Sequence, residues 1–242
     1  MKALVIGGSS GIGLSIVLQL VRDASVEHVF VVDKAEFPVV YNDSKIEWHR
    51  CDLSLGDYSV FEELENIQAL YITAGFGHLK WFQDLSEDYI NASFSVNAIA
   101  PIQIIRHYYD KLLSKDDFYC AVMVSIAGRL SSPLFSVYSA TKAALSKFIE
   151  AVNVELDVQG SQNRILEVSP GSLKGTGFNG GASQPELTES LATEIIERSK
   201  KHETLFIPQY EEVFKDVIER YQSDPHKFGV ESYWYKKKQG RF

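Results

Sequence analysis

The chain lacks the features that mark several classes of protein. It has only two cysteines, Cys51 and Cys120, in separate strand-like runs, so both are expected to be buried thiols and no disulfide is expected. No apolar stretch is long enough to span a bilayer, and no membrane partner is expected. No group of histidines and cysteines has metal-ligand spacing, and the Gly-x-Ser-x-Gly elbow of a hydrolase is missing.

The charge and the layout of the chain exclude further classes. A net charge of −8 argues against nucleic acid as a partner. The first apolar run begins at residue 3, which leaves no room for a signal peptide, so a cytoplasmic location is expected. The basic run Lys236–Lys238 is interpreted as part of a solvated tail. No repeat or low-complexity linker interrupts the 242 residues, so one domain over 1–242 is predicted.

What the chain does contain is a regular alternation of short apolar runs and helical stretches, continuing to residue 169. This alternation predicts an α/β fold of the Rossmann type. The expected architecture is a doubly wound parallel sheet with right-handed crossovers, flanked by helices on both faces.

Glycines separate the first strand-like run from the first helical stretch. Gly7 and Gly11 permit tight backbone geometry and close approach to phosphate, and Gly13 lets the helix pack near the strand. Free N–H groups at the start of such a helix bind a dinucleotide pyrophosphate. Asp33 ends the next strand-like run, where a carboxylate accepts hydrogen bonds from the adenosine ribose and repels a 2′-phosphate. The pattern favours NAD over NADP, a preference weakened by Lys34.

The strongest catalytic pattern in the chain is Tyr138 and Lys142, with Ser125 thirteen positions before the tyrosine. Residues four apart share one face of a helix, so the two side chains can approach each other. The Lys142 ammonium is then expected to lower the pKa of the Tyr138 phenol toward neutral pH. The same tyrosine–lysine spacing occurs at 41/45 and 233/237, but neither copy has a serine thirteen residues upstream. A chance surface pair is the preferred interpretation of those two copies.

These motifs together resemble the compact branch of the short-chain dehydrogenase/reductase family, over about residues 2–176. Further matches are Asp52-Leu53, Ala74-Gly75, Asn97 and Pro170-Gly171, in the order of the family. The resemblance and the residue pattern predict the catalytic residues Asn97, Ser125, Tyr138 and Lys142. They predict cofactor binding by Gly7, Ser9, Ser10, Gly11, Ile12, Gly13, Asp33, Asp52, Leu53, Ala74, Gly75, Tyr138, Lys142, Pro170, Gly171, Leu173 and Thr176.

The resemblance implies an oxidoreductase that moves a hydride between NAD(H) and a carbonyl or secondary alcohol of a small-molecule substrate. Tyr138 is expected to act as general acid and base, and Ser125 to hold the substrate oxygen. Lys142 is expected to bind the nicotinamide ribose, with Asn97 supporting it through a water. Two alternatives stay open: an NAD(H)-binding redox sensor or scaffold with little turnover, and epimerase or dehydratase chemistry on a nucleotide sugar.

Several segments depart from the family pattern. Ile72-Thr73 replaces the usual asparagine pair, and Thr176 stands one position beyond the usual threonine. The usual last strand is not evident, and 228–242 is interpreted as an atypical C-terminal tail. The glycine-rich start of 171–202, which includes Gly180 and Gly181, indicates a substrate lid. The helical stretches 86–112 and 136–158 are expected to form a homodimer or homotetramer by resemblance.

Overall fold

The structure, a computed structural model, describes residues 1–179 and 182–240. Gly180 and Gly181 of the predicted lid lie outside the described residues, as do the last two residues of the predicted tail. Within the described part, a seven-stranded parallel sheet has the strand order β3-β2-β1-β4-β5-β6-β7. The strands are β1 Lys2–Ile6, β2 His28–Asp33, β3 Ile46–Arg50, β4 Ala69–Ile72, β5 Tyr119–Met123, β6 Ile165–Val168 and β7 Leu205–Phe206.

The strand order reverses beside β1, as the predicted doubly wound fold requires. β1 pairs with β2 on one side and with β4 on the other, both in parallel. The helices are α1 Gly11–Arg22, α2 Glu87–Phe94, α3 Ala100–His107, α4 Tyr109–Leu113, α5 Ser136–Val158, α6 Glu189–Lys200, α7 Lys215–Ser223 and α8 Pro225–Lys238. Because open α/β sheets bind ligands beyond the carboxyl ends of their strands at such a switch point, this edge is where a cofactor is expected.

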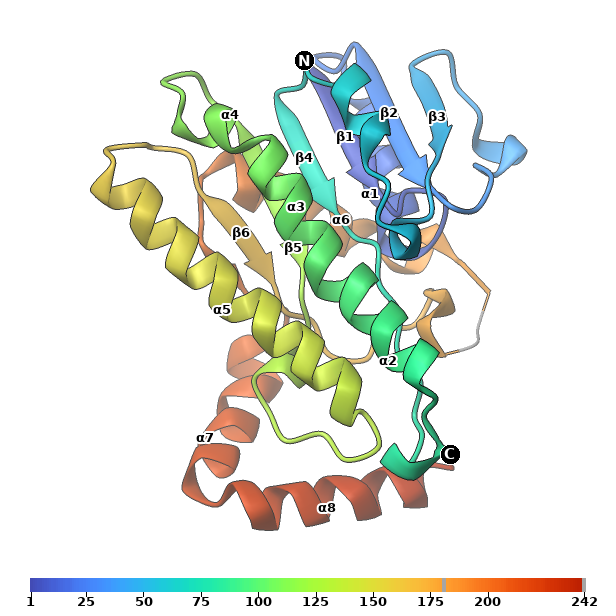
Figure 1. Ribbon diagram of the computed structural model, residues 1–242, viewed down its shortest axis with the longest axis vertical. Helices are drawn as coiled ribbons and strands as arrows, with labels where there is room; N and C mark the ends of the chain where they lie inside the picture. The colour runs from blue at the N-terminus through green and yellow to red at the C-terminus, as the bar shows by residue number, and fades with distance from the viewer. Residues whose placement is uncertain (180–181, 241–242) are drawn as a thin grey trace.

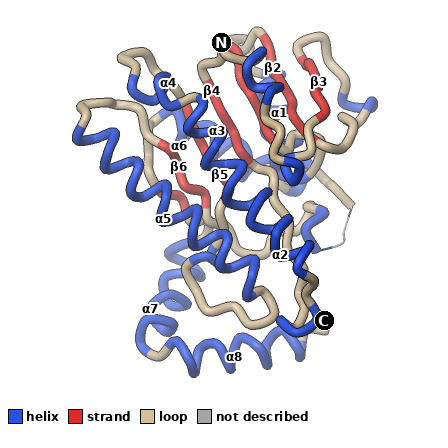
Figure 2. The backbone as a smooth tube through the Cα atoms, viewed as in Figure 1, coloured by secondary structure: helices blue, strands red, loops and turns tan. Residues whose placement is uncertain are grey.

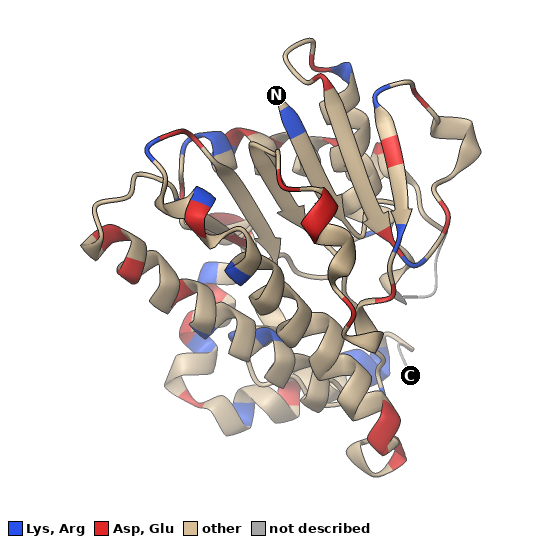
Figure 3. Cartoon of the chain, turned by 45° about the horizontal axis from the view of Figure 1, so that its top comes forward, with Lys and Arg blue, Asp and Glu red and all other residues tan. Residues whose placement is uncertain are grey.

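Helices cover both faces of the sheet, and each face has its own apolar core. Ile104, Leu145 and Leu156 from α3 and α5 pack on one face. Ile16 and Ile195 from α1 and α6 pack on the other face. Figures 1 and 2 show the sheet between these two layers of helices, with α7 and α8 below it. Figure 3 shows the central strands almost free of charged residues, which gather on the surrounding helices and loops.

The end of the chain differs from the sequence interpretation. A seventh strand, β7, pairs with β6 in parallel, so the sheet has a further strand that the sequence pattern did not indicate. It was missed because two residues are too few to give a strand pattern. The predicted tail is helical: α8 begins after Asp224, whose carboxylate caps the helix by accepting a hydrogen bond from the Lys227 N–H. Lys236, near its end, is buried, so the interpretation as a solvated tail is wrong for this residue.

The remaining fold predictions match the structure at most points. The stretch 136–158 is the single helix α5, and 86–112 is the nearly continuous series α2 to α4. Both cysteines are free, and Cys120 is buried as expected. Cys51 is only half-buried, because it follows β3 instead of lying inside it. Among the described residues, no helix is both long and apolar enough to cross a membrane.

Candidate active site

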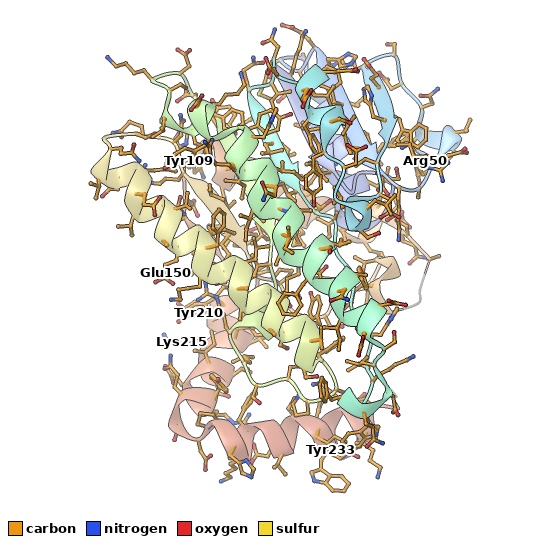
Figure 4. All side chains as sticks on the ribbon, viewed as in Figure 1. Arg50, Tyr109, Glu150, Tyr210, Lys215 and Tyr233 are labelled. Carbon is orange, nitrogen blue, oxygen red and sulfur yellow. The ribbon has the colours of Figure 1, made fainter. Side chains whose placement is uncertain are left out.

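A cavity of about 620 Å³ lies at the carboxyl edge of the sheet. Every predicted site residue except Ser9 and Asn97 lines it, from the Gly7–Gly13 turn at one end to Tyr138 at the other. Of the three tyrosine–lysine spacings, the described lining of the cavity includes Tyr138 with Lys142 and neither other pair. Tyr41 lies in a short turn before β3, and Tyr233 lies on α8, labelled at the bottom of Figure 4.

The glycine turn has almost no room for side chains. A Cβ atom on Gly13 would lie 2.1 Å from the Gly7 carbonyl oxygen, and one on Gly7 would lie 2.5 Å from the Ala74 nitrogen. Gly7 also has a φ of +82°, which disfavours other residues. The Thr73 hydroxyl fastens this region by donating to the Ile6 carbonyl at 2.8 Å. The turn where the family usually has an asparagine is thus held here by a threonine. Backbone cradles of this kind, at the start of a helix, suit a pyrophosphate.

Asp33 lies at the end of β2 and is held by two backbone N–H groups. Its Oδ2 accepts from Ser9 at 3.0 Å, and its Oδ1 accepts from Ala35 at 3.0 Å. Ser9 thus orients the carboxylate and does not itself line the cavity. Asp52 lies nearby and accepts from both the backbone and the hydroxyl of Ser54, which holds its pKa below the usual range. This end of the cavity has the hydrogen-bond acceptors that an adenosine ribose needs.

Ser125 and Tyr138 meet at the other end. Ser125 follows β5 and caps the short turn Ile126–Gly128 by accepting from the Ala127 N–H at 3.1 Å. The Ile126 N–H donates to the Pro170 carbonyl at 3.0 Å, which ties this turn to the end of β6. Tyr138 lies in the first turn of α5 and is 7 % exposed. Burial raises the pKa of the phenol to about 12, and a hydrogen bond with Ser125 acts in the opposite direction.

The direction of that pKa shift corrects the sequence prediction, which had Lys142 lowering it. The Lys142 ammonium is 5.9 Å from the centroid of the Tyr138 ring and donates to the Met123 carbonyl at 2.9 Å. It is itself buried, and burial lowers its own pKa to about 8. Desolvation by burial is the largest cause of the shift in both groups. With only the protein's own groups around it, the Tyr138 phenol is protonated at neutral pH, as a proton donor must be.

Asn97 acts on the turn after β4. Its side-chain amide donates to the Phe76 carbonyl at 2.8 Å, and its Oδ1 accepts from the Phe76 N–H at 3.0 Å. The residue lies in a π-helical turn, Ser95–Ile99, between α2 and α3. Such turns recur at functional sites. A Cβ atom on Gly75 would lie 3.2 Å from Asn97 Oδ1 and 3.3 Å from Lys142 Nζ, so both side chains lie just behind this glycine.

Aromatic residues form the wall near Tyr138. The Phe135 and Phe178 rings lie 5.2 Å and 5.1 Å from the Tyr138 ring, measured between centroids. Phe76 and His78 also line the cavity, whereas Trp81 lies outside it and packs against Tyr233. Sequence reasoning missed Phe135 and Lys236, which lie between or beyond the motifs and match no motif position. The other lining residues that were not predicted include Lys34, Cys51, Val124, Ile126, Ser132 and Ser172.

Comparison with known proteins identifies the class. Residues 1–187 match the family described as short chain dehydrogenase. The chain therefore belongs to the short-chain dehydrogenase family. It is 31% identical over 187 residues to an oxidoreductase of Saccharomyces cerevisiae, TDA5, covering 73% of this chain and 56% of the relative. The match thus spans about half the length of that relative, whose own name calls it uncharacterized.

Two solved structures show the same fold. A short-chain dehydrogenase from Sphingobium yanoikuyae in complex with NADPH has a TM-score of 0.73 at 20% identity, covering 92% of this chain and 95% of that one. A 4-hydroxyisoleucine dehydrogenase complexed with NADH and succinate has a TM-score of 0.71 at 21% identity, covering 86% of this chain and 97% of that one. At these identities the likeness establishes the fold alone.

Proposed function

We propose that the protein transfers a hydride between a nicotinamide cofactor and a carbonyl or secondary alcohol substrate, with Tyr138 as general acid and base. The observation that carries this is the meeting of Ser125, Tyr138 and Lys142 in one cavity with the glycine cradle. A nicotinamide bound there supplies or accepts the hydride. The protein handles the proton and positions the substrate.

Each residue has one task in this proposal. In reduction, Tyr138 donates its phenol proton to the substrate oxygen while Ser125 donates a hydrogen bond to the same oxygen. In oxidation, the phenolate takes the proton back. Lys142 binds the ribose next to the nicotinamide and places a positive charge beside the phenolate. Asn97 keeps the Ala74–Phe76 turn in place through its two bonds to Phe76.

NAD is the proposed cofactor. The fixed Asp33 carboxylate suits the two free hydroxyls of the NAD ribose and repels the 2′-phosphate of NADP. NADP is a second candidate, because Lys34 also lines the cavity, and both Lys34 and Arg50 lie close enough to Asp52 to lower its pKa. Arg50, the last residue of β3, is labelled at the right edge of the molecule in Figure 4. Fluorescence titration with NADH and NADPH decides between them, and tighter NADPH binding overturns the role of Asp33.

The segment before α6 is proposed as the lid. The second half of 171–202 is α6, whose Ala192 and Ile195 are in the core, so the lid is confined to residues before Glu189. Two of its residues, Thr176 and Phe178, line the cavity. Its far end is fastened to α1, since the Ser15 hydroxyl lies 2.6 Å from Thr188 Oγ1. Closure of this segment excludes water from the reaction.

A cytoplasmic homodimer or homotetramer completes the proposal. Val154 and Val158 on α5 are 60% and 82% exposed, which supports this helix as a contact between subunits. Two free cysteines suit a reducing compartment. Light scattering of the purified protein tests the assembly, and fractionation of the producing cells tests the location.

Substitution of Tyr138 tests the mechanism. Tyr138→Phe removes the proton donor and leaves the aromatic ring, so turnover is expected to fall by about 10²–10⁴-fold. Binding of NADH, measured by fluorescence, stays within about twofold because the glycine cradle is untouched. Tyr41→Phe is the matched control, because it has the same spacing to a lysine but lies outside the cavity, and it keeps full turnover. Near-normal turnover of Tyr138→Phe contradicts the mechanism.

A further inference from the structure

A carboxylate is buried behind the reaction end of the cavity. Glu167 is the third residue of β6 and is 3% exposed, and no other Asp or Glu of the described chain is buried. Its neighbours in the strand, Leu166 and Val168, pack in the apolar core. Burying an ionised carboxylate costs free energy unless the group is paired and hydrogen-bonded. The partners of Glu167 therefore show what the residue does.

Both carboxylate oxygens of Glu167 are hydrogen-bonded. Oε1 accepts from Arg129 Nη2 at 2.7 Å and Nε at 3.2 Å, and from the Ser169 hydroxyl at 2.7 Å. Oε2 accepts from the Ser146 hydroxyl at 2.9 Å. Hydrogen bonds to an ionised group are stronger than neutral ones and fix the geometry of their partners. Each of the three partners lies in a different segment of the chain.

Two of these partners hold the segments around the reactive serine. The turn Ile126–Gly128 begins at Ser125, which caps it, and Arg129 follows the turn directly. Ser169 precedes Pro170, whose carbonyl oxygen lies 3.5 Å from Ser125 Oγ. The carboxylate is therefore bonded to both segments that border Ser125.

The third partner lies on the helix of the reactive phenol. Tyr138, Lys142 and Ser146 follow one another at intervals of four residues, so they share one face of α5. All three are buried. The face of α5 that presents the phenol is thus bonded, about two turns further along, to the carboxylate that also holds the Ser125 turn.

We propose that Glu167 is a positioning residue, which holds the Ser125 turn and α5 in the relative placement at which Ser125 and Tyr138 meet. The proposal rests on the proposed hydride transfer and adds to it a residue that does not line the cavity. Because the serine and the tyrosine come from separate segments, the bonds that join these segments set the distance between them. A displacement of about 1 Å can lower a rate on the order of 10²-fold.

A role in stability alone makes a different prediction. In that case Glu167 only fastens α5 to β6, and every molecule that folds reacts at the normal rate. The helix has a separate attachment to this strand, since the Asn153 side chain exchanges two hydrogen bonds with the Ile165 backbone, at 2.9 Å and 2.8 Å. Glu167→Gln keeps the shape of the side chain and removes its charge, so α5 is expected to stay docked.

Steady-state kinetics with a matched control give the first test. With cyclohexanone and acetophenone as probe ketones, Glu167→Gln is expected to lower kcat by about tenfold or more. KM for the cofactor stays within about twofold, because the glycine cradle is untouched. Asp157→Asn makes the same chemical change at the other end of α5, where the mostly exposed Asp157 pairs with Arg164 before β6, and it keeps both values.

Coupling to Ser125 separates positioning from stability. If Glu167 acts by placing Ser125, its substitution matters little once the serine hydroxyl is gone. Glu167→Gln is therefore expected to lower the residual kcat of Ser125→Ala by less than about twofold. The same loss in both backgrounds, or a wild-type kcat for Glu167→Gln, overturns the proposal.

Hydrogen exchange tests the placement without turnover. The Ala127 N–H donates to Ser125 Oγ at 3.1 Å, so its exchange reports how firmly the serine is held. Glu167→Gln is expected to speed exchange across 125–129 by about fivefold or more and to leave 7–13 unchanged. Faster exchange confined to this turn in a protein that reduces neither ketone supports the positioning, and the proposed function then fails alone. Unchanged exchange, or equal acceleration in both segments, overturns the positioning.

A milder variant keeps the test decisive if Glu167→Gln does not fold. Ser146→Ala removes one hydrogen bond of the carboxylate and leaves its pairing with Arg129 intact. It is expected to change kcat and the exchange of 125–129 in the same directions as Glu167→Gln, by about two- to fivefold. A Ser146→Ala variant with wild-type values of both contradicts the connection between α5 and the Ser125 turn.

Discussion

The two ends of the cavity are built in different ways. The cofactor end is backbone packed against backbone, where Gly7 and Gly13 meet neighbouring main-chain atoms that leave no room for a Cβ. The substrate end is made of side chains from segments far apart in the chain: the aromatic wall, the Ser132 loop and Lys236 of α8. If the proposed function holds, the first end accepts one cofactor geometry. The second can change its substrate by exchanging single side chains, which is how one fold serves many reactions.

The largest expected effect tests the rigidity of the cofactor end. Gly13→Ala places a Cβ 2.1 Å from the Gly7 carbonyl oxygen, so α1 must move away from β1. We expect a loss of about 4 kcal/mol or more in the free energy of unfolding, and no measurable NADH binding. Urea unfolding and NADH fluorescence measure both.

The matched control is a glycine near the substrate end. Gly177 lines the cavity, and an added Cβ meets nothing within 4 Å. Gly177→Ala is therefore expected to change the free energy of unfolding by less than about 1 kcal/mol. Similar losses for the two variants contradict the contrast between the ends.

Lys142 lies where the two ends meet, and its burial is expected to reduce stability in a pH-dependent way. Its pKa falls from 10.5 to about 8 on burial, so between these values the unfolded chain binds the proton and the folded chain does not. Stability linked to this residue therefore rises with pH between 8 and 10.5. Below pH 8 the Lys142 amine is charged in both the folded and the unfolded chain, and its burial lowers the free energy of unfolding by on the order of 3 kcal/mol.

Lys142→Met removes that cost. We expect the free energy of unfolding of the variant to be about 1–3 kcal/mol higher than that of wild type at pH 7. This difference is expected to shrink toward pH 10. Urea unfolding at several pH values measures it. Lys147→Met, an exposed lysine on the same helix, gives no pH-dependent difference. A difference for Lys142→Met that stays constant from pH 7 to 10 contradicts the burial effect.

The same contrast explains what the sequence can and cannot predict. Gly7, Gly13 and Asp33 lie in one local stretch of chain, so their spacing carries the information. The residues predicted to bind the cofactor, other than Ser9, line the cavity. Lys236 is one of three consecutive lysines that look alike in sequence. Its burial depends on packing against Ser132, 104 residues earlier, which no local pattern encodes. The pKa of Tyr138 was predicted in the wrong direction for a related reason, since spacing gives proximity and burial comes only from the fold.

The smallest expected effect concerns the proposed lid, which connects the two ends. The Gly11 N–H at the start of α1 donates to Ser183 Oγ at 2.7 Å. Deeper in the molecule, the Ser15 hydroxyl donates to the Pro185 carbonyl at 3.0 Å and contacts Thr188. Because this bond is only partly buried, Ser183→Ala is expected to lower the free energy of unfolding by less than about 1 kcal/mol. The buried bonds at Ser15 are expected to hold the far end of the lid.

Limited trypsin cleavage at Lys174, an exposed residue near the start of this segment, measures lid opening. We expect Ser183→Ala to speed cleavage by about two- to fivefold, and Ser15→Ala to speed it more, since burial makes a lost bond more costly. Excess NADH should slow cleavage in wild type if the lid closes over the cofactor. Equal rates for wild type and both variants would mean that the lid is held from the substrate end, by Phe178 against Tyr138, and the attachment to α1 would then have no part in opening.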